Sequence, residues 1–467
     1  MRIPILWVLG AALVGVLAVF AVGQAFLNPP LPLIISAGFD DPLISPNADG
    51  TNDLTTFRYA LARNARISLT LTAEDGQVYA FRQDEPRLAG EYSVLFSGVV
   101  DGFLKPNEDV SGVVERRLLD NGVYTWALVA ENDAGERSSI NGTLTLEGAD
   151  ATLPTLSAFT VAPSVFTPNQ DGVDDRVEIN VYLDKPAHLT VFLIDANGRQ
   201  LPISARKEGR KVGEAGRHIF DYEGGIDLGA DPPKDGTYTI VALAQDAVGQ
   251  RVRQEASLTI RNGGKPRAEI VPQAVGVDVA FIVRPYEERY LSTFDALGDL
   301  IDMPNEPASL SRNPITMQVG DLLVFKLTVE NYNNVPIRTS LPPPGTVYQQ
   351  DQMAASLGAF QESGAWRVGI QCETSTTSFP YRWAVGSADD LISETDPRTG
   401  ITYYYLPAGA RAVVWGAVRM TSIEKRQNPQ NCWAGLIHED VEVSLRNSFV
   451  GARQILLVDP TATNDGN

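Results

Sequence analysis

The chain has 467 residues, of which 44% are hydrophobic and 20% charged, and its formal net charge is −19. This composition is typical of a folded protein, and the length suits roughly three domains of ~100–200 residues each. The acidic balance argues against a surface for nucleic acid or anionic lipid, because both need clustered lysine and arginine. We therefore expect no nucleic-acid partner.

The N-terminal segment is apolar. Residues 3–22 contain no charged side chain, and a helix needs about 20 such residues to cross a bilayer. Arg2 precedes this run, whereas the stretch after it carries no charge. The positive-inside tendency then places residues 28–467 outside the cytoplasm, on a single-pass protein of the cell membrane. Residues 23–25 would also suit a signal peptidase, so residues 1–27 are predicted to be either a transmembrane anchor or a signal segment.

A loop motif occurs twice and indicates an internal repeat. Residues 45–53 read Ser-Pro-Asn-Ala-Asp-Gly-Thr-Asn-Asp, and residues 167–175 read Thr-Pro-Asn-Gln-Asp-Gly-Val-Asp-Asp. The offset between the two copies stays constant from Pro46 to Gly76, so nothing is inserted or deleted over that span. Further along, the spacing changes, which predicts loops of unequal length between the strands.

Both copies show the pattern of a β-sandwich. Apolar residues alternate with polar ones in residues 67–71, and residues 189–193 follow the same pattern more loosely, so that one face of each strand points inward. Turn signals such as Asn197-Gly198 separate these runs. About seven short strands in roughly 110 residues, without a helical period, is typical of a sandwich.

The ordered turns of each copy resemble the immunoglobulin-like domain of the flagellar hook-capping protein family. The shared features are P-N-x-D-G-x-[ND]-D, a strand end with tyrosine at Tyr59 or Tyr182, an A-G segment, D-G-x-Y and a final D-x-x-G. Phe96 and Tyr222 stand where that family has the tryptophan of W-D-G. The resemblance implies an immunoglobulin-like fold for both copies.

The remainder of the chain differs from the repeats. Residues 319–331 alternate like a half-buried strand, and Leu-Pro-Pro-Pro-Gly at 341–345 and Leu-Pro-Ala-Gly-Ala at 406–410 follow. These features resemble the all-β domain of unknown function that is repeated in bacterial and archaeal cell-surface proteins. The predicted organisation is a Pro-rich spacer (28–34), two immunoglobulin-like domains (35–149 and 154–262), a linker (263–269), a C-terminal all-β domain (270–460) and a tail (461–467).

The two loops concentrate oxygen donors. Calcium takes about six to eight oxygens, so the loops are candidate calcium sites, although the EF-hand pattern is not met. The alternative is that the same side chains cap the turn by bonding to their own backbone. The candidate ligands are Asn47, Asp49, Asn52, Asp53, Asn169, Asp171, Asp174 and Asp175.

The chain has two cysteines, Cys372 and Cys432. In an exported protein they are predicted to form a disulfide, which would stabilise the fold by roughly 4 kcal/mol in the chain-entropy model. Two buried free thiols are the alternative. A zinc site is disfavoured because the paired C-x-x-C spacing is missing.

The sequence shows no familiar catalytic motif. The three histidines, His188, His218 and His438, are far apart, and neither a nucleophile elbow nor a phosphate-binding loop is present. We expect a non-enzymatic, membrane-anchored structural or adhesive protein that projects a β-sandwich module to bind a protein or an envelope polymer. Two alternatives stay open, namely an accessory subunit of a membrane protein complex, and a carbohydrate-binding module or degraded hydrolase.

Overall fold

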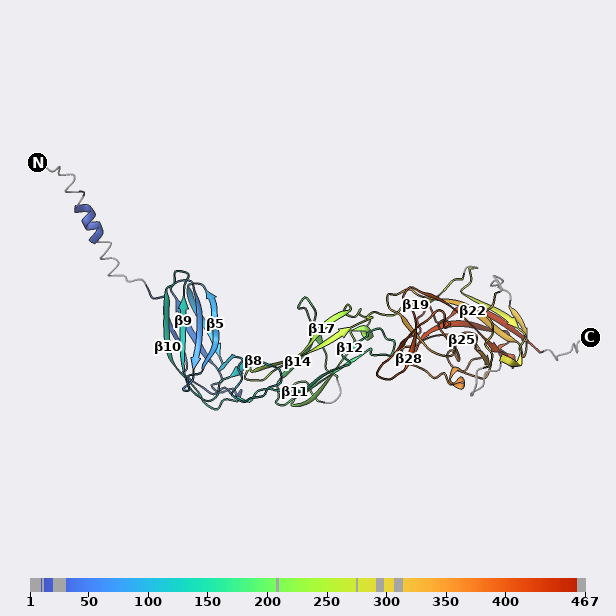
Figure 1. The fold of residues 1–467 in the computed structure, drawn as a ribbon, viewed down its shortest axis with the longest axis horizontal. Coiled ribbons are helices and arrows are strands. Elements are labelled where there is room, and N and C mark those ends of the chain that lie inside the picture. The colour runs from blue at the N-terminus through green and yellow to red at the C-terminus, as the bar shows by residue number, and fades with distance from the viewer. Residues whose placement is uncertain are drawn as a thin grey trace, which may run out of the picture.

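The structure, a computed structural model, is all-β as predicted. It describes residues 10, 12–19, 31–206, 210–273, 276–290, 298–305 and 314–459. In these ranges the strands form six sheets, joined by turns and four short 3₁₀ helices. The 3₁₀ helices are η1 (Ile226–Leu228), η2 (Glu288–Tyr290), η3 (Ala354–Leu357) and η4 (Lys425–Gln427). Three sandwiches follow one another along the molecule, and the C-terminal one is the largest (Figure 1).

The N-terminal segment is described only in part. Residues 10 and 12–19 are helical. Within the described ranges, no helix has the length and apolar character needed to span a membrane. The predicted span, residues 3–22, lies largely outside these ranges, so the transmembrane anchor stays a prediction.

The first sandwich consists of two facing sheets. The strand orders are β1-β3-β6 and β2-β10-β9-β4-β5. Alternate residues of β3 and β9 are buried, because successive side chains of a strand point to opposite faces. The strands are β1 (Ile34–Phe39), β2 (Leu43–Ile44), β3 (Thr55–Leu61), β4 (Ala65–Thr72), β5 (Val78–Arg87), β6 (Gly90–Phe96), β9 (Gly122–Glu131) and β10 (Arg137–Leu146).

The second sandwich repeats this order strand for strand. One sheet is β11-β13-β16, and the other contains β15-β14-β17-β18 with β12 paired to β18. The internal repeat of the sequence is therefore a repeat of the fold. The strands are β11 (Leu156–Ala162), β12 (Val165–Phe166), β13 (Val177–Leu183), β14 (His188–Ile194), β15 (Gln200–Ile203), β16 (Gly216–Tyr222), β17 (Gly236–Gln245) and β18 (Arg251–Ile260).

The third sandwich is built from two larger sheets. One has the order β19-β22-β29-β24 with β20 paired to β22, and the other β21-β31-β30-β25-β23-β28-β27 with β26 paired to β25. Its core between the sheets includes Trp366 and Trp383. The strands are β19 (Ala268–Val271), β20 (Val279–Arg284), β21 (Ile315–Gln318), β22 (Leu322–Asn331), β23 (Ile337–Thr339), β24 (Val347–Gln349), β25 (Trp366–Cys372), β26 (Tyr381–Ala384), β27 (Ile392–Thr395), β28 (Thr402–Leu406), β29 (Arg411–Arg419), β30 (Gln430–His438) and β31 (Val450–Val458).

The predicted disulfide is confirmed. Cys372 at the end of β25 lies directly opposite Cys432 in β30, and the two sulfurs are bonded. Both side chains are buried in the core of the third sandwich. The bond therefore joins neighbouring strands of one sheet.

The longer connection of the first repeat contains strands of its own. The sequence predicts only that the later loops of the two repeats differ in length, and between β6 and β9 the first repeat forms β7 (Val99–Asp101) and β8 (Val113–Leu118). These strands belong to a sheet of the second sandwich, because β8 pairs antiparallel with β18. The pairing of β8 with a strand of another domain leaves no local signal in the sequence.

A small core closes this first junction. Val114 of β8, Val252 of β18 and Leu153 of the connecting segment pack together. Gly112 lies so close to the second sandwich that a Cβ there would stand 2.3 Å from the Arg253 carbonyl oxygen. Backbone pairing and close packing together make the junction a continuous structure.

The amide of Gln250 lies at the centre of the same junction. Its side chain is fully buried. Nε2 donates to the carbonyl oxygens of Asp150 (3.1 Å) and Thr152 (2.8 Å) and to Oδ2 of Asp246 (2.8 Å). Oε1 accepts from the backbone N–H of Leu118 at 3.3 Å. One side chain thus joins the first sandwich, the connecting segment and the second sandwich.

We expect Gln250→Ala to loosen the first junction. The substitution leaves buried donors and acceptors without partners, each at a cost of about 1–3 kcal/mol. Proteolysis of the segment 147–155 measures the effect, and it should become faster. The matched control is Glu136→Ala, because Glu136 is the corresponding residue of the first repeat and is exposed. Equal cleavage of both variants would contradict the role given to Gln250.

Candidate functional site

The two Pro-Asn-x-Asp-Gly loops fold alike. The final aspartate of each loop accepts hydrogen bonds from the loop backbone: Oδ2 of Asp53 from Gly50 N–H at 2.7 Å, and Oδ2 of Asp175 from Gly172 N–H at 2.5 Å. Both glycines have left-handed backbone angles, with φ of 89° and 82°. The aspartates therefore hold the loops in a tight turn, as the capping alternative expects.

The same hydrogen bonds bear on the calcium prediction. Oδ1 of Asp53 accepts from two further backbone N–H groups, and the first asparagine and aspartate of each loop also accept backbone N–H bonds. Among the described residues, no group of three or more His, Cys, Asp or Glu side chains is arranged to hold a metal ion. The eight candidate ligands lie together in two sets of four, and calcium binding by them stays a prediction.

The surroundings of the two loops differ. Asp49 is exposed, whereas its counterpart Asp171 is only 5% exposed. The second loop is covered by the third sandwich. A Cβ on Gly172 would lie 2.1 Å from the Ser363 carbonyl oxygen, and one on Gly364 would lie 2.2 Å from the Asp171 carbonyl carbon. Glycine is required at both positions because the two backbones touch.

Polar contacts hold the loop on the third sandwich. The His438 ring Nε2 lies 2.7 Å from the Gln170 carbonyl oxygen, and the ring stacks on Trp366. Burial lowers the pKa of His438 to about 4, so the ring is neutral near pH 7 and its Nε2–H donates to the carbonyl. Arg398 forms an ion pair with Asp174 at 2.6 Å. The second junction is therefore built from charges and hydrogen bonds.

Sequence reasoning missed most of these partners. His438 lies far along the sequence from the loop that it contacts, and its neighbour Glu439 is buried between Arg367 (3.0 Å) and Arg382 (2.8 Å). Arg398 lies 224 residues from Asp174. A single sequence carries no signal for contacts at such separations.

Burial changes the acidity of the second loop. It raises the pKa of Asp171 to about 7, and the charge of Asp175 adds to the effect. Burial also raises the pKa of Asp175. For Asp53, burial acts in the same direction, but the backbone N–H bonds of the loop outweigh it and the pKa is lowered. The same motif therefore lowers the pKa of Asp53 in the first copy, whereas the pKa values of Asp171 and Asp175 are raised in the second.

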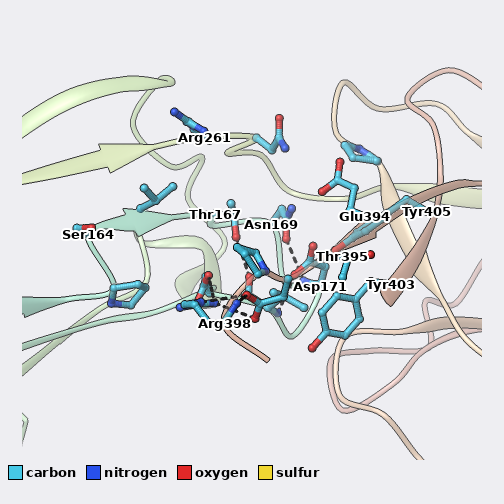
Figure 2. A pocket seen from close by; sticks show the side chains of 18 residues that line it. Ser164, Thr167, Asn169, Asp171, Arg261, Glu394, Thr395, Arg398, Tyr403 and Tyr405 are labelled. Atoms are coloured by element: carbon cyan, nitrogen blue, oxygen red, sulfur yellow. Dashed lines mark hydrogen bonds and ion pairs between the residues drawn. The ribbon is translucent and has the colours of Figure 1, made fainter. Parts of the chain in front are cut away.

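A cavity of about 770 Å³ opens between the second and third sandwiches beside this loop. Figure 2 shows its side chains, with Asp171 near Tyr403 and Arg261 on the opposite side. The walls come from both domains. They are Pro163, Ser164, Val165, Thr167, Asn169, Asp171, Val173, Asp174, Arg261 and Asn262 of the second sandwich, and Pro336, Glu394, Thr395, Asp396, Pro397, Arg398, Tyr403 and Tyr405 of the third.

Neither a protein-family model nor a curated protein sequence matches the chain. Among solved structures, it is similar to a Ca²⁺-stabilized adhesin that helps an Antarctic bacterium bind ice, at 12% identity over 91% of this chain and 73% of that one, with a TM-score of 0.22. A tetra-tandem repeat from the extending region of a large adhesion protein has 12% identity, coverage of 92% and 93%, and a TM-score of 0.18. The alpha-2-macroglobulin of E. coli has 11% identity, coverage of 92% and 23%, and a TM-score of 0.17. Such TM-scores carry no argument, and no family is assigned.

The glycines of the two loops provide a matched test of the second junction. Alanine at a left-handed position costs roughly 1–2 kcal/mol. Gly50→Ala meets nothing within 4 Å, whereas Gly172→Ala meets the backbone of Ser363. We expect only Gly172→Ala to open the junction, which trypsin would report as faster cleavage after Arg261 and Arg267. Equal cleavage in both variants would show that the junction does not depend on this contact.

The raised pKa of Asp171 predicts a pH dependence of the same junction. The folded state favours the protonated carboxyl, so its stabilisation is full below the ordinary pKa of 3.8 and is lost as the pH rises through about 7. Asp171→Asn keeps the oxygen that accepts from Val173 N–H but removes the charge. The buried His438 of the same junction acts in the opposite sense between about pH 4 and its ordinary pKa of 6.5, so the variant and the native chain are compared at each pH. We expect Asp171→Asn to become more trypsin-resistant than the native chain as the pH rises from about 5 to about 7.

Asp49→Asn is the control, since this residue occupies the corresponding exposed position. It should retain the pH dependence of the native chain. A difference in protease resistance between Asp171→Asn and the native chain that stays constant over this pH range would contradict the assignment to Asp171.

Calcium addition tests whether the two loops bind calcium or are only turns capped by their own side chains. The carboxylate oxygens already accept backbone N–H groups in both copies, so we expect added calcium to leave the melting temperature unchanged. Calorimetry with calcium and with a chelator is the measurement. A clear upward shift with calcium, lost in Asp53→Asn, would favour the calcium prediction instead.

Proposed function

We propose that the chain is a non-enzymatic extracytoplasmic arm, held at the cell membrane by its predicted N-terminal anchor, that presents the third sandwich to a protein or an envelope polymer. The observation that carries the proposal is the construction of the two junctions. The first is a shared sheet, in which β8 of one repeat pairs with β18 of the next. The second is a buried polar loop pressed against the third sandwich.

Such junctions suit an arm that must hold a fixed direction. Separate domains on a free linker would sample many orientations and reach a partner only part of the time. A strand of ten residues such as β9 is about 33 Å long at ~3.3 Å per residue. Three sandwiches in a row therefore reach on the order of 100 Å from their first residue.

The third sandwich also carries an exposed apolar loop. Between β30 and β31, Leu445 is 96% exposed and Phe449 60% exposed, and Val441 and Val443 lie near them in sequence with 37% and 39% exposure. Exposed apolar groups gathered in one segment are typical of interaction sites. This loop, residues 441–449, is the contact surface that the proposal favours.

Site-specific photo-cross-linking in intact cells tests the proposal. A photoreactive residue at position 445 should cross-link to a partner outside the cytoplasm. The same residue at position 88 is the control, because Leu88 is also well exposed, at 68%, but lies in the first sandwich. Protease added to whole cells should remove a tag placed in residues 461–467. Protection of the tag, or equal cross-linking from both positions, would contradict the arm model.

A further inference from the structure

The cavity between the second and third sandwiches has the form of a ligand site. Its volume of about 770 Å³ lies within the ~300–1,000 Å³ of small-molecule sites, and such sites are frequent at domain interfaces. One wall follows β12 and the loop 167–174 of the second sandwich, and the other is the hairpin of β27 and β28. Both walls are fixed by the contacts of the second junction.

Two charged side chains at the rim are free to bind a ligand. Arg261 and Glu394 are exposed, and neither side chain has a hydrogen bond or ion pair with any described residue. By contrast, Arg398 is already paired with Asp174 and Asp396. The free groups thus present one positive and one negative charge to the cavity.

The remaining lining is mixed, with polar groups, aromatic rings, prolines and two valines. The exposed side chains of Ser164 and Asn262 can donate and accept hydrogen bonds, whereas Asn169 and Asp171 are buried and their side-chain oxygens already accept backbone N–H groups of the loop. Tyr403 adds an aromatic ring, whose apolar face suits the C–H face of a sugar ring. Because carboxylates outnumber guanidinium groups around the cavity, an anionic ligand is disfavoured.

We propose that this cavity binds a neutral oligosaccharide. The hydroxyl groups of such a ligand are both donors and acceptors, which matches the mixed lining. The inference rests on the proposed function in one respect, since it names a saccharide as an envelope polymer that the arm contacts through this cavity, in addition to the contact at residues 441–449. A bound chain that touches both walls would also tie the second sandwich to the third.

A peptide added as an extra strand fits the cavity less well. β12 has only two residues and β27 only four, so either edge offers few backbone hydrogen bonds. Strand addition also needs pockets for alternate apolar side chains. The apolar part of this lining comes from prolines, tyrosines and the two valines Val165 and Val173, which belong to several loops and strands and do not form one row.

Calorimetric titration of the full chain in detergent tests the inference. The probes are short linear oligosaccharides of glucose, xylose, mannose, galactose and N-acetylglucosamine. At least one should bind, and both Arg261→Gln and Glu394→Gln should weaken it about tenfold or more, the loss expected for a hydrogen bond to a charged group. Arg137→Gln and Glu91→Gln are matched controls, because these exposed residues lie on strands of the first sandwich and should bind as the native chain does.

Three results would overturn the inference: no binding of any probe, binding that neither cavity substitution weakens, or binding of a pooled random peptide library that these substitutions abolish. The thermal midpoint of each variant shows that it is folded. Failure here leaves the arm model intact, because cross-linking from position 445 and protease access to the tag do not depend on Glu394. If position 445 gave no cross-link and protease did not remove the tag, the arm model would be contradicted instead.

Discussion

The rest of the structure depends on backbone contact across domain boundaries. A strand edge with unpaired N–H and C=O groups is open to pairing, and here β8 of the first repeat occupies part of the edge of β18 in the second. The side chain of Gln250 lies at this junction, where it accepts a hydrogen bond from Leu118 N–H of the first repeat and donates one to the Thr152 carbonyl oxygen of the connecting segment. Because buried polar groups are costly when they lose a partner, the relative position of the two sandwiches is set by the same forces that fold each of them.

The second junction uses the repeated loop for a different purpose. In the first sandwich the loop is mostly exposed, and its hydrogen bonds serve its own turn apart from the one that the Pro46 carbonyl accepts from Asp150 N–H. In the second sandwich the same turn is pressed against Gly364 and the ring of His438, which buries Asp171 and raises its pKa. A preformed rigid turn needs little further ordering when it docks, which makes it a suitable element for an interface.

The sequence predicted what is local. Alternation, turn residues and the repeat indicated the sandwiches, and the cysteine pair indicated the disulfide between β25 and β30. It did not predict the pairing of β8 with a strand of the next domain, nor the cavity between the second and third sandwiches. Asp171 was named as a possible ligand, but its burial could not be foreseen, since the residues that cover it come far later in the chain. Contacts between domains depend on how the folded domains are placed relative to one another. Neither the periodicity of apolar residues nor the composition of the chain encodes that placement.

The central claim is that the three sandwiches form one arm with a fixed shape. Spin labels at positions 88 and 445, both exposed in the first and third sandwiches, measure this directly by the distance distribution between them. The account predicts a single narrow distribution at a long distance. A broad or multiple distribution in the native chain would show that the sandwiches move independently and would contradict the account.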